Sequence, residues 1–115
     1  MSEYCIDCKN YEGIRITFSE KQRSEKAFKH PELNEEGFIK RIVKAVTNPH
    51  FVYEDLSDKN RYAYYIREYA INSRIIYTKV IVKKRDKICF IITAYRPDYV
   101  KERSKSRLLY GEDNE

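Results

Sequence analysis

The chain has 115 residues, of which 42% are hydrophobic and 36% are charged, which is enough for one domain with a core and too few for two. No apolar run approaches the roughly 20 residues of a membrane-spanning helix, and the first residues lack the basic and apolar pattern of a secretory signal. Three cysteines are an odd number for a disulfide scaffold. We therefore expect a reduced, cytoplasmic protein with no membrane partner.

The positive charge of the chain is unevenly distributed. The 23 Lys and Arg exceed the 18 Asp and Glu, a formal net charge of +5. Nine basic and two acidic residues fall between positions 59 and 87, a region that is also rich in tyrosine. A basic, tyrosine-rich sheet favours a polyanion whose bases stack on the rings. The alternative is an ordinary sheet with lysines on its hydrated face.

The first helix is predicted from a capping signal. Residues 1–12 are expected to be a polar lead-in, and residues 13–18 alternate apolar and polar side chains, which is typical of a short strand. Ser19 followed three residues later by Gln22 forms a capping box. A helix should therefore begin here and end at about residue 29.

A second helix is expected after the proline at position 31, which breaks the first. Asn34 is a suitable N-cap, and Asn48-Pro49 marks the end. The apolar residues between these limits recur at helical spacing, with lysines and an arginine outside the stripe. They are Phe38, Ile39, Ile42, Val43 and Val46.

From residue 51 the apolar period changes from about 3.6 to 2, which indicates strands. Alternation places Tyr64 and Ile66 on one face of a strand, with Tyr65 and Arg67 on the other. Because the connections are short, we expect an antiparallel meander. Its strands are predicted over residues 51–54, 61–69, 74–83 and 88–95.

The strand over residues 88–95 is a continuous apolar run without charge, which predicts a central strand buried on both faces. It ends in two hydroxyl residues, Thr93 and Tyr95. A period of two puts both on the same face as Cys89 and Ile91. Two hydroxyls at one end of a buried strand suggest a site there.

The fold class follows from the order of the elements. Residues 98–109 should form a helix or an ordered tail, and residues 110–115 a disordered acidic tail. Helices that precede a run of strands predict an α+β domain over residues 13–109. We expect N-terminal helices packed on one face of a twisted antiparallel sheet of about four strands.

The sequence lacks the residue patterns of a zinc site, a phosphate-binding loop and a pair of catalytic carboxylates. The Cys5-x-x-Cys8 pair is two ligands short of a structural zinc site, and we interpret it as incidental. The three glycines do not cluster into a phosphate-binding loop, and no paired carboxylates occur on the strands. We therefore assign no metal and no cofactor.

The His, Thr, Tyr, Arg and Lys residues that remain suit metal-independent cleavage of RNA. His30 is the best acid–base candidate because histidine titrates near neutrality, although it could simply cap a helix or sit in a turn. Thr93 and Tyr95 could equally be hydroxyls at the edge of the core. Arg67 and Lys79 could face a phosphate or water.

Four short motifs resemble one nuclease family. They are His-Pro-Glu-Leu at 30–33, Asn-Pro-x-x-Val-Tyr at 48–53, Val-Ile-Val at 80–82 and Ile-Ile-Thr-Ala-Tyr at 91–95. At this spacing they look like the phage and mobile-element nucleases of the barnase/EndoU/colicin D/RelE-like (BECR) superfold. The resemblance covers roughly residues 14–96. It implies two N-terminal helices against a four-stranded antiparallel sheet, with an RNA-cleaving site on the concave face.

The resemblance also implies roles for single residues. His30 would be the helix-borne catalytic histidine and Thr93 the hydroxyl of the last core strand, with Tyr95 and either Arg67 or Lys79 binding or polarising the phosphate. Many members carry a second His or Arg upstream of the His-Pro corner. This chain instead has Arg23, Lys26 and Lys29, so the partner of His30 stays open. Other expected nucleic-acid contacts are Arg61, Tyr65 and Arg96.

Our first hypothesis is a small endoribonuclease of toxin or phage-effector type that cleaves RNA, such as tRNA or mRNA, by attack of the ribose 2′-OH. A second is a nucleic-acid-binding module on the same fold without catalysis. A third is a protein-interaction domain of a toxin–antitoxin pair, whose basic face meets an acidic antitoxin or immunity protein.

Overall fold

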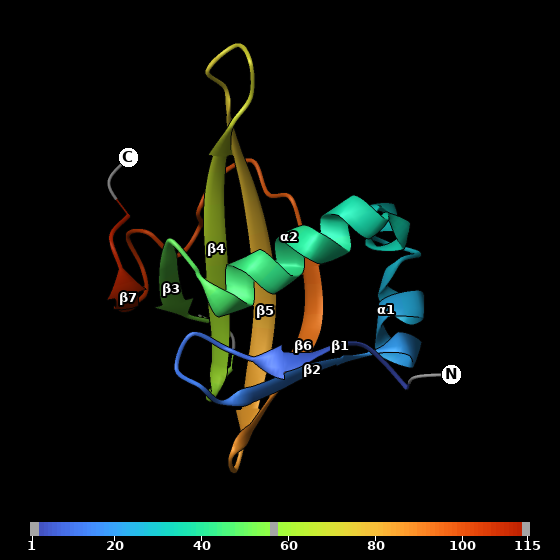
Figure 1. Ribbon diagram of the computed structural model, residues 1–115. Helices are drawn as coiled ribbons and strands as arrows, with labels where there is room; N and C mark the ends of the chain where they lie inside the picture. The colour runs from blue at the N-terminus through green and yellow to red at the C-terminus, as the bar shows by residue number, and fades with distance from the viewer. Residues whose placement is uncertain (1–2, 56–57, 114–115) are drawn as a thin grey trace.

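The computed structural model describes residues 3–55 and 58–113, which form an α+β fold of two α-helices, one short 3-10 helix and a seven-stranded sheet (Figure 1). The strand order is β1-β2-β6-β5-β4-β3-β7, and all neighbours are antiparallel except β2 and β6. The elements are β1 (Tyr4–Lys9), β2 (Arg15–Ser19), α1 (Glu20–Lys26), η1 (Pro31–Asn34), α2 (Glu36–Thr47), β3 (Phe51–Glu54), β4 (Arg61–Tyr69), β5 (Ile75–Arg85), β6 (Ile88–Tyr95) and β7 (Leu108–Gly111).

The α+β class and the β3–β4–β5–β6 meander agree with the sequence prediction, but the expected sheet of about four antiparallel strands is too small. One edge is extended by β2, which pairs in parallel with β6, and by β1, which lies in the predicted lead-in. The other edge is extended by β7. The short, largely polar β1 escaped prediction because its single buried apolar side chain, Ile6, shows no period.

The predicted disordered tail is wrong for the residues that the structure describes. Tyr110 and Gly111 belong to β7 and pair with β3, and the side chain of Asp113 is buried. Gly111 has φ +77°, and a Cβ there would lie 2.0 Å from the carbonyl oxygen of His50. Glycine therefore permits the close approach of β7 to the start of β3. Residues 114–115 lie outside the described part, as do residues 56–57 of the predicted turn.

The helices form largely where the sequence predicts them. The Ser19 hydroxyl accepts the hydrogen bond of the Gln22 backbone N–H at 3.0 Å, which confirms the N-cap of α1. The prediction that Asn34 caps α2 is wrong, because Asn34 ends the 3-10 turn that Pro31 begins and Glu35 occupies the cap. None of the described helices is long and apolar enough to cross a membrane.

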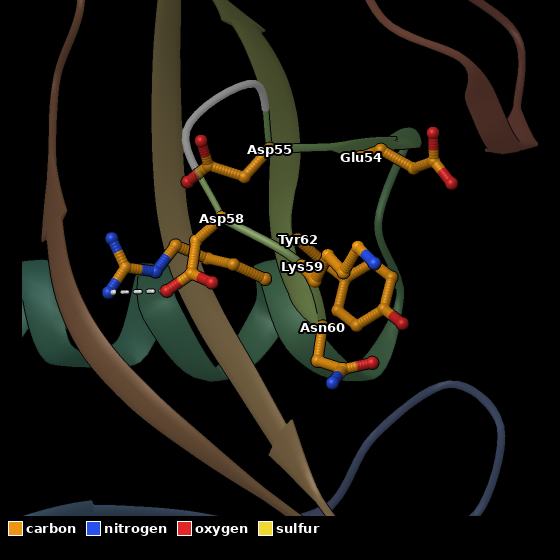
Figure 2. Close-up of a pocket in the computed structure, with 7 residues that line it drawn as sticks. Glu54, Asp55, Asp58, Lys59, Asn60 and Tyr62 are labelled. Atoms are coloured by element: carbon orange, nitrogen blue, oxygen red, sulfur yellow. Dashed lines mark ion pairs between the residues drawn. The ribbon is translucent and has the colours of Figure 1, made fainter.

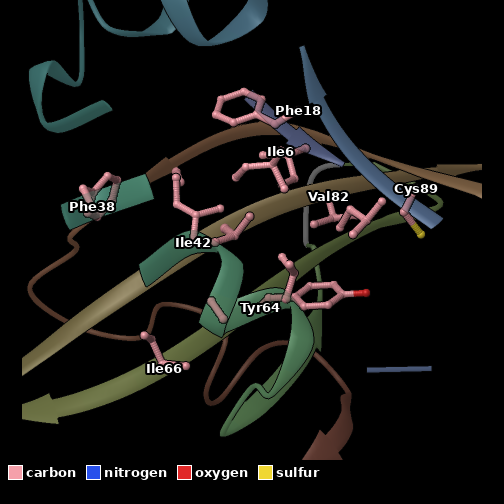
Figure 3. Packing of buried hydrophobic residues seen from close by; sticks show 14 of the residues in the cluster. Ile6, Phe18, Phe38, Ile42, Tyr64, Ile66, Val82 and Cys89 are labelled. Atoms are coloured by element: carbon pink, nitrogen blue, oxygen red, sulfur yellow. The ribbon is translucent and has the colours of Figure 1, made fainter. Parts of the chain in front are cut away.

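The main core lies between α2 and one face of the sheet. Figure 1 shows α2 running diagonally across β4, β5 and β6. Its buried Phe38, Ile42 and Val46 pack against apolar side chains of six strands, some of which are seen in Figure 3. The strand residues of this cluster include Ile6, Phe18, Val52, Tyr64, Ile66, Val80, Val82, Cys89 and Ile91. The apolar stripe of α2 thus covers the sheet as predicted.

A second, smaller core fills the opposite face. It contains Phe51, Tyr53, Tyr65 and Tyr77 from the sheet, covered by Val100. Val100 belongs to the connection 96–107, which consists of bends and turns, whereas the sequence predicts a helix or ordered tail over residues 98–109. Figure 1 shows this connection passing behind the sheet, on the side away from α2. It therefore shields part of the face on which the candidate site lies.

A β-bulge in β6 changes where its hydroxyl residues point. Val82 pairs with Ile91, but Ile81 pairs with Thr93, so Ile92 is an extra residue in the ladder. The carbonyl of Ile92 accepts a hydrogen bond of 2.9 Å from the Gln22 side chain. Because one inserted residue reverses the alternation, Thr93 and Tyr95 face the second core and not the α2 side. The predicted common face with Cys89 and Ile91 is wrong for this reason.

Candidate active-site cleft

A hollow of ≈ 440 Å³ on the face away from α2 brings together most of the predicted site residues. We call it the basic cleft. Its sides come from the turn after α1, from β4, β5 and the end of β6, and from the connection after β6. The lining residues are Lys26, Lys29, His30, Asp55, Arg61, Lys79, Ile81, Ile92, Thr93, Tyr95 and Lys101.

His30 lies against Tyr95 at one side of the basic cleft. The two rings are stacked, with centroids 4.7 Å apart and an interplanar angle of 9°. The backbone N–H of His30 closes the α1 turn by donating to the Lys26 carbonyl at 2.9 Å. The imidazole makes no capping bond to η1. The turn therefore fixes the backbone, and the ring lines the basic cleft while it stacks on Tyr95.

The surroundings of His30 favour its neutral form. Partial burial lowers its pKa below the ordinary value of 6.5, and Lys29 and Lys26 lower it further, while Glu32 acts in the opposite direction. A histidine with a pKa below 6.5 is mostly unprotonated at neutral pH. It can then accept a proton from a substrate hydroxyl.

The basic cleft has an excess of positive charge. Lys26, Lys29 and Lys101 join Arg61 at its rim, and Asp55 is the carboxylate among the lining residues. The three lysines come from outside the strands: Lys26 ends α1, Lys29 lies in the turn after it, and Lys101 belongs to the connection 96–107. This concentration of cations in a concave surface attracts anions such as phosphodiesters.

Lys79 forms the floor of the cleft through a buried ion pair. Its ammonium donates a hydrogen bond of 2.7 Å to the Glu102 carboxylate, and the two side chains are 2% and 0% exposed. The Tyr65 hydroxyl donates to the other oxygen of Glu102. The ammonium also lies 5.7 Å from the centre of the Tyr95 ring. Lys79 is thus held rigidly behind Tyr95, with its charge compensated by Glu102.

Two polar atoms in the basic cleft have no hydrogen-bond partner within the described residues. They are the hydroxyl oxygen of Thr93 and Nε of Arg61, both buried. Buried polar groups are almost always paired with protein, water or a ligand. The Thr93 hydroxyl and Nε of Arg61 are therefore two groups of the cleft that water or a polar ligand would pair.

Three predicted residues do not line the basic cleft. Tyr65 is completely buried under Lys79, so its ring cannot stack on a base. The Arg96 guanidinium packs 4.6 Å from the centre of the Phe38 ring and faces Glu35. Arg67 lies further along the same sheet face, over the Phe51 ring and 3.7 Å from Asp113. The prediction that Arg67 shares the site with His30 is not supported by this placement.

Asp55, Lys101 and Glu102 belong to the cleft or its floor but were not predicted. Glu102 in particular is an acid within a basic, loop-forming stretch, a context that normally indicates an exposed residue. Its burial depends on Lys79, which lies 23 positions earlier in the chain. No periodic signal in the sequence reports such a pairing.

A second hollow, of ≈ 540 Å³, adjoins the basic cleft and shares Asp55 and Arg61 with it. Figure 2 shows Asp55 and Asp58 on one side of this hollow and Glu54 on the other. Asp58 is already paired with Arg61 at 3.7 Å and with Lys83 at 3.2 Å. Because its charges are mixed and largely compensated, this hollow is the weaker candidate for an anion.

Across the described ranges 3–55 and 58–113, no group of three or more His, Cys, Asp or Glu is arranged to hold a metal ion. Cys5 and Cys8 lie on β1 as half-buried free thiols, and the Cys5 thiol donates to the Phe18 carbonyl. Cys5 and Cys8 thus pack against the main core as part of β1.

Comparison of the chain with protein-family models, with curated proteins and with solved structures finds no match. The interpretation of the basic cleft accordingly depends on its own residues.

Proposed function

We propose that this protein is a small endoribonuclease that cleaves RNA in the basic cleft without a metal ion. The observation that carries the proposal is the convergence of His30, Thr93 and Tyr95 with three lysines in one hollow. Nuclease chemistry on RNA needs a group that accepts a proton, a group that donates one and cations for the phosphate. Each of these is present within the cleft.

The proposed reaction begins with the neutral imidazole of His30, which takes the proton of the ribose 2′-OH. The 2′ oxygen attacks phosphorus, and the bond from phosphorus to the 5′ oxygen breaks. The 5′ oxygen takes a proton from a donor of the cleft, for which the Tyr95 hydroxyl and the ammonium groups of Lys26 and Lys29 are the candidates. The products are a 2′,3′-cyclic phosphate and a 5′-hydroxyl. Thr93 and the lysines stabilise the negative charge on the phosphorane oxygens.

The experiment is cleavage of a mixed RNA in EDTA by the wild type and by His30→Ala. General base catalysis contributes roughly 10²- to 10⁴-fold, so His30→Ala should lose at least about 100-fold in rate. Thr93→Val, which removes the unpaired hydroxyl at similar size, should lose less. The matched control is His50→Gln, because His50 is the other of the two histidines and lies outside the cleft.

Each result has a clear meaning if circular dichroism shows that the variants are folded. Cleavage at the wild-type rate by His30→Ala would rule out the proposed base. An inactive wild type that binds RNA in a salt-dependent manner would favour the non-catalytic binding module. An inactive wild type that does not bind RNA but binds an acidic protein tightly would favour the interaction domain.

A further inference from the structure

A third hollow, lined largely by tyrosines, lies on the face of the sheet that α2 covers. Its volume is ≈ 290 Å³, and we call it the tyrosine pocket. Val52, Tyr64 and Cys89 belong to the main core, so the pocket opens at the margin of that core. The basic cleft and the tyrosine pocket share none of their described lining residues. The residues that line the pocket are Tyr11, Glu12, Val52, Tyr62, Tyr64, Lys84, Cys89 and Leu109.

The tyrosine pocket lies beyond the C-terminal end of α2. The backbone N–H of Tyr11 donates a hydrogen bond of 2.9 Å to the carbonyl of Val46, in the last turn of α2. The turn between β1 and β2 is thereby fixed next to the end of the helix. Figure 1 shows this turn on the same side of the sheet as α2, near the start of β4. The helix therefore leaves this end of the sheet to the tyrosines.

Aromatic rings form the walls of the pocket. The Tyr11 ring meets the Tyr64 ring edge-to-face, with centroids 5.6 Å apart, and lies 4.4 Å from the Tyr110 ring. Tyr62 precedes Tyr64 by two positions on β4, so both side chains are on one face of the sheet. Tyr11 and Tyr62 are only half-buried, which leaves part of each ring accessible. Flat heteroaromatic rings such as nucleobases stack on tyrosine.

The Tyr64 hydroxyl is a fixed polar group of the pocket. Tyr64 is 3% exposed, and its hydroxyl accepts a hydrogen bond of 3.0 Å from the Asn10 side-chain amide. Asn10 is itself held in place, because its side-chain carbonyl accepts from the backbone N–H groups of Glu12 and Ile14, each at 2.9 Å. Figure 3 shows the Tyr64 hydroxyl pointing away from the rest of the cluster.

The proton of the Tyr64 hydroxyl has no acceptor among the residues that the structure describes. A phenol that accepts a hydrogen bond from an amide still has its own O–H to donate. Buried donors of this kind are normally paired, with protein, water or a ligand. An acceptor atom of a bound ring would complete the hydrogen bonding of Tyr64.

The rim of the pocket carries one charge of each sign. Burial raises the pKa of Tyr11 to about 12, and the neighbouring Glu12 adds to the rise, so Tyr11 stays a neutral phenol beside that carboxylate. Lys84, on β5, forms no ion pair with the described part of the chain. Its ammonium is therefore available to a phosphate group.

We propose that the tyrosine pocket binds a nucleobase that carries a phosphate. The ring stacks on Tyr62 or Tyr11, an acceptor atom of the base meets the Tyr64 hydroxyl, and the phosphate meets Lys84. A purely apolar ligand would leave the Tyr64 hydroxyl unpaired, and a simple anion would leave the aromatic walls unused. The volume is near the lower limit of about 300 Å³ for ligand sites, which suits a small flat ring.

The base can belong to a free mononucleotide or to a nucleic-acid strand, because the same groups recognise both. The inference goes beyond the proposed ribonuclease activity, since the pocket and the basic cleft are on opposite faces of the sheet. It requires no cleavage and no catalytic residue.

The first test is binding of adenosine 5′-monophosphate, measured by isothermal titration calorimetry. Ribose 5-phosphate, which lacks the base, should bind much more weakly. Tyr62→Leu should weaken nucleotide binding at least about 5-fold, the low end for loss of one base stack. Tyr64→Phe, which removes only the hydroxyl, should weaken it roughly 2- to 10-fold. Tyr69→Leu and Tyr69→Phe are the matched controls, because Tyr69 is on the same strand, 68% exposed and outside the pocket.

Charge variants establish which hollow holds the nucleotide. Lys84→Gln should weaken binding of adenosine 5′-monophosphate, while Lys87→Gln, exposed in the same hairpin and outside the pocket, should not. The double variant Lys26→Gln/Lys29→Gln is measured in parallel, because the basic cleft also attracts phosphate. An affinity that falls in this double variant but not in the tyrosine variants would assign the nucleotide to the basic cleft and overturn the proposal.

A short single-stranded oligodeoxyadenylate distinguishes the two sources of the base. If the pocket accepts a base of a strand, Tyr62→Leu should bind the oligonucleotide more weakly than Tyr69→Leu does. If it accepts only free nucleotides, Tyr62→Leu should lose affinity for adenosine 5′-monophosphate alone. Unchanged affinity for both ligands in Tyr62→Leu would refute the pocket.

The outcomes for the pocket and for the cleft can be told apart. A wild type that binds adenosine 5′-monophosphate through Tyr62 but leaves RNA intact would reject the proposed function and retain the pocket. RNA cleavage that depends on His30, in a protein without nucleotide binding, would do the reverse.

A measurement on the wild type does not depend on folding of the variants. The backbone amide signals of Tyr64 and Cys89 are followed by NMR during titration with adenosine 5′-monophosphate. Both should shift, and ribose 5-phosphate should leave them in place. Shifts confined to residues of the basic cleft, such as Lys29 and His30, would contradict the proposal.

Discussion

His30 illustrates how neighbouring residues can prepare one side chain for catalysis. Its backbone position follows from the turn before Pro31, and its ring position from the stack on Tyr95. Burial and two lysines then lower the pKa of the imidazole, so that the base is neutral near pH 7. The same lysines are available to bind the phosphate. In the proposed mechanism, one local arrangement would therefore serve both proton transfer and substrate binding.

The pH dependence of cleavage should reveal the effect of the two lysines on the pKa of His30. The proposed mechanism requires neutral His30, so the rate should fall as the pH decreases through the pKa of His30, which lies below 6.5. Replacing Lys26 and Lys29 by Gln removes two charges that lower this pKa. The acid limb of the pH–rate profile should therefore move to higher pH in Lys26→Gln/Lys29→Gln. Lys9→Gln, on β1 at the edge of the sheet, is the control that should leave it in place.

An acid limb that does not move in the lysine variant would show that Lys26 and Lys29 do not set the pKa of the titrating base. Loss of rate at every pH without a shift would assign the lysines to phosphate binding alone.

The connection 96–107 has a larger role than its irregular backbone suggests. Four consecutive residues face four different surroundings: Val100 packs in the second core, Lys101 lines the cleft, Glu102 pairs with Lys79, and Arg103 holds Asp113. The turn is closed by the Arg103 backbone N–H, which donates to the Val100 carbonyl at 3.3 Å. The segment therefore contacts the second core, the basic cleft and Asp113.

Glu102 should be essential for the stability of this arrangement. Removing one partner of a buried ion pair typically costs about 3–5 kcal/mol, because the other charge stays buried. Glu102→Leu should accordingly lower the free energy of unfolding by about that amount, as measured by urea denaturation. The double variant Lys79→Met/Glu102→Leu should recover much of the loss, since it leaves no unpaired buried charge.

A matched exposed pair sets the baseline for that measurement. Glu54→Gln disrupts the ion pair with Arg107, whose side chains are 44% and 73% exposed, and should cost less than about 1 kcal/mol. If Glu102→Leu were as mild as Glu54→Gln, the buried pair would not stabilise the fold.

The two faces of the sheet are covered by different parts of the chain. One is covered by α2 and holds the main core, as Figures 1 and 3 show. The other has a smaller aromatic core, and the basic cleft lies beside it. Because the lysines of the basic cleft and Arg61 lie on the face away from α2, the proposed polyanion should approach from that side.

The salt dependence of binding tests this orientation. Each phosphate contact on a single strand contributes about 0.7 to the slope of log K against log salt. Lys26→Gln, Lys29→Gln and Lys101→Gln should each reduce the slope for single-stranded DNA by roughly that amount. Lys40→Gln, on the exposed surface of α2, should not change it. Equal effects from Lys40 and the cleft lysines would indicate binding spread over the entire surface.

Local signals were sufficient for much of the secondary structure. Ser19 and Gln22 are close enough in the chain to form the N-cap on their own, and the apolar stripe of α2 and the strands β3 and β4 obey simple periods. These features depend on residues within a few positions of one another, so periodicity and capping rules describe them. His30, Thr93, Tyr95, Lys79 and Arg61 could be selected by residue type and meet in one cleft.

Contacts between distant residues decided the rest. The bulge at Ile92 turned Thr93 and Tyr95 to the other face, and its carbonyl is held by Gln22, 70 positions away. The hydrogen bond from Tyr53 to Asp113, 60 positions away, helps to order the tail that the sequence predicts to be disordered. Arg67 was assigned to the site of His30 but faces Asp113 instead. Such contacts form only when the chain is folded, because their stabilisation depends on burial and charge pairing that no short stretch of sequence contains.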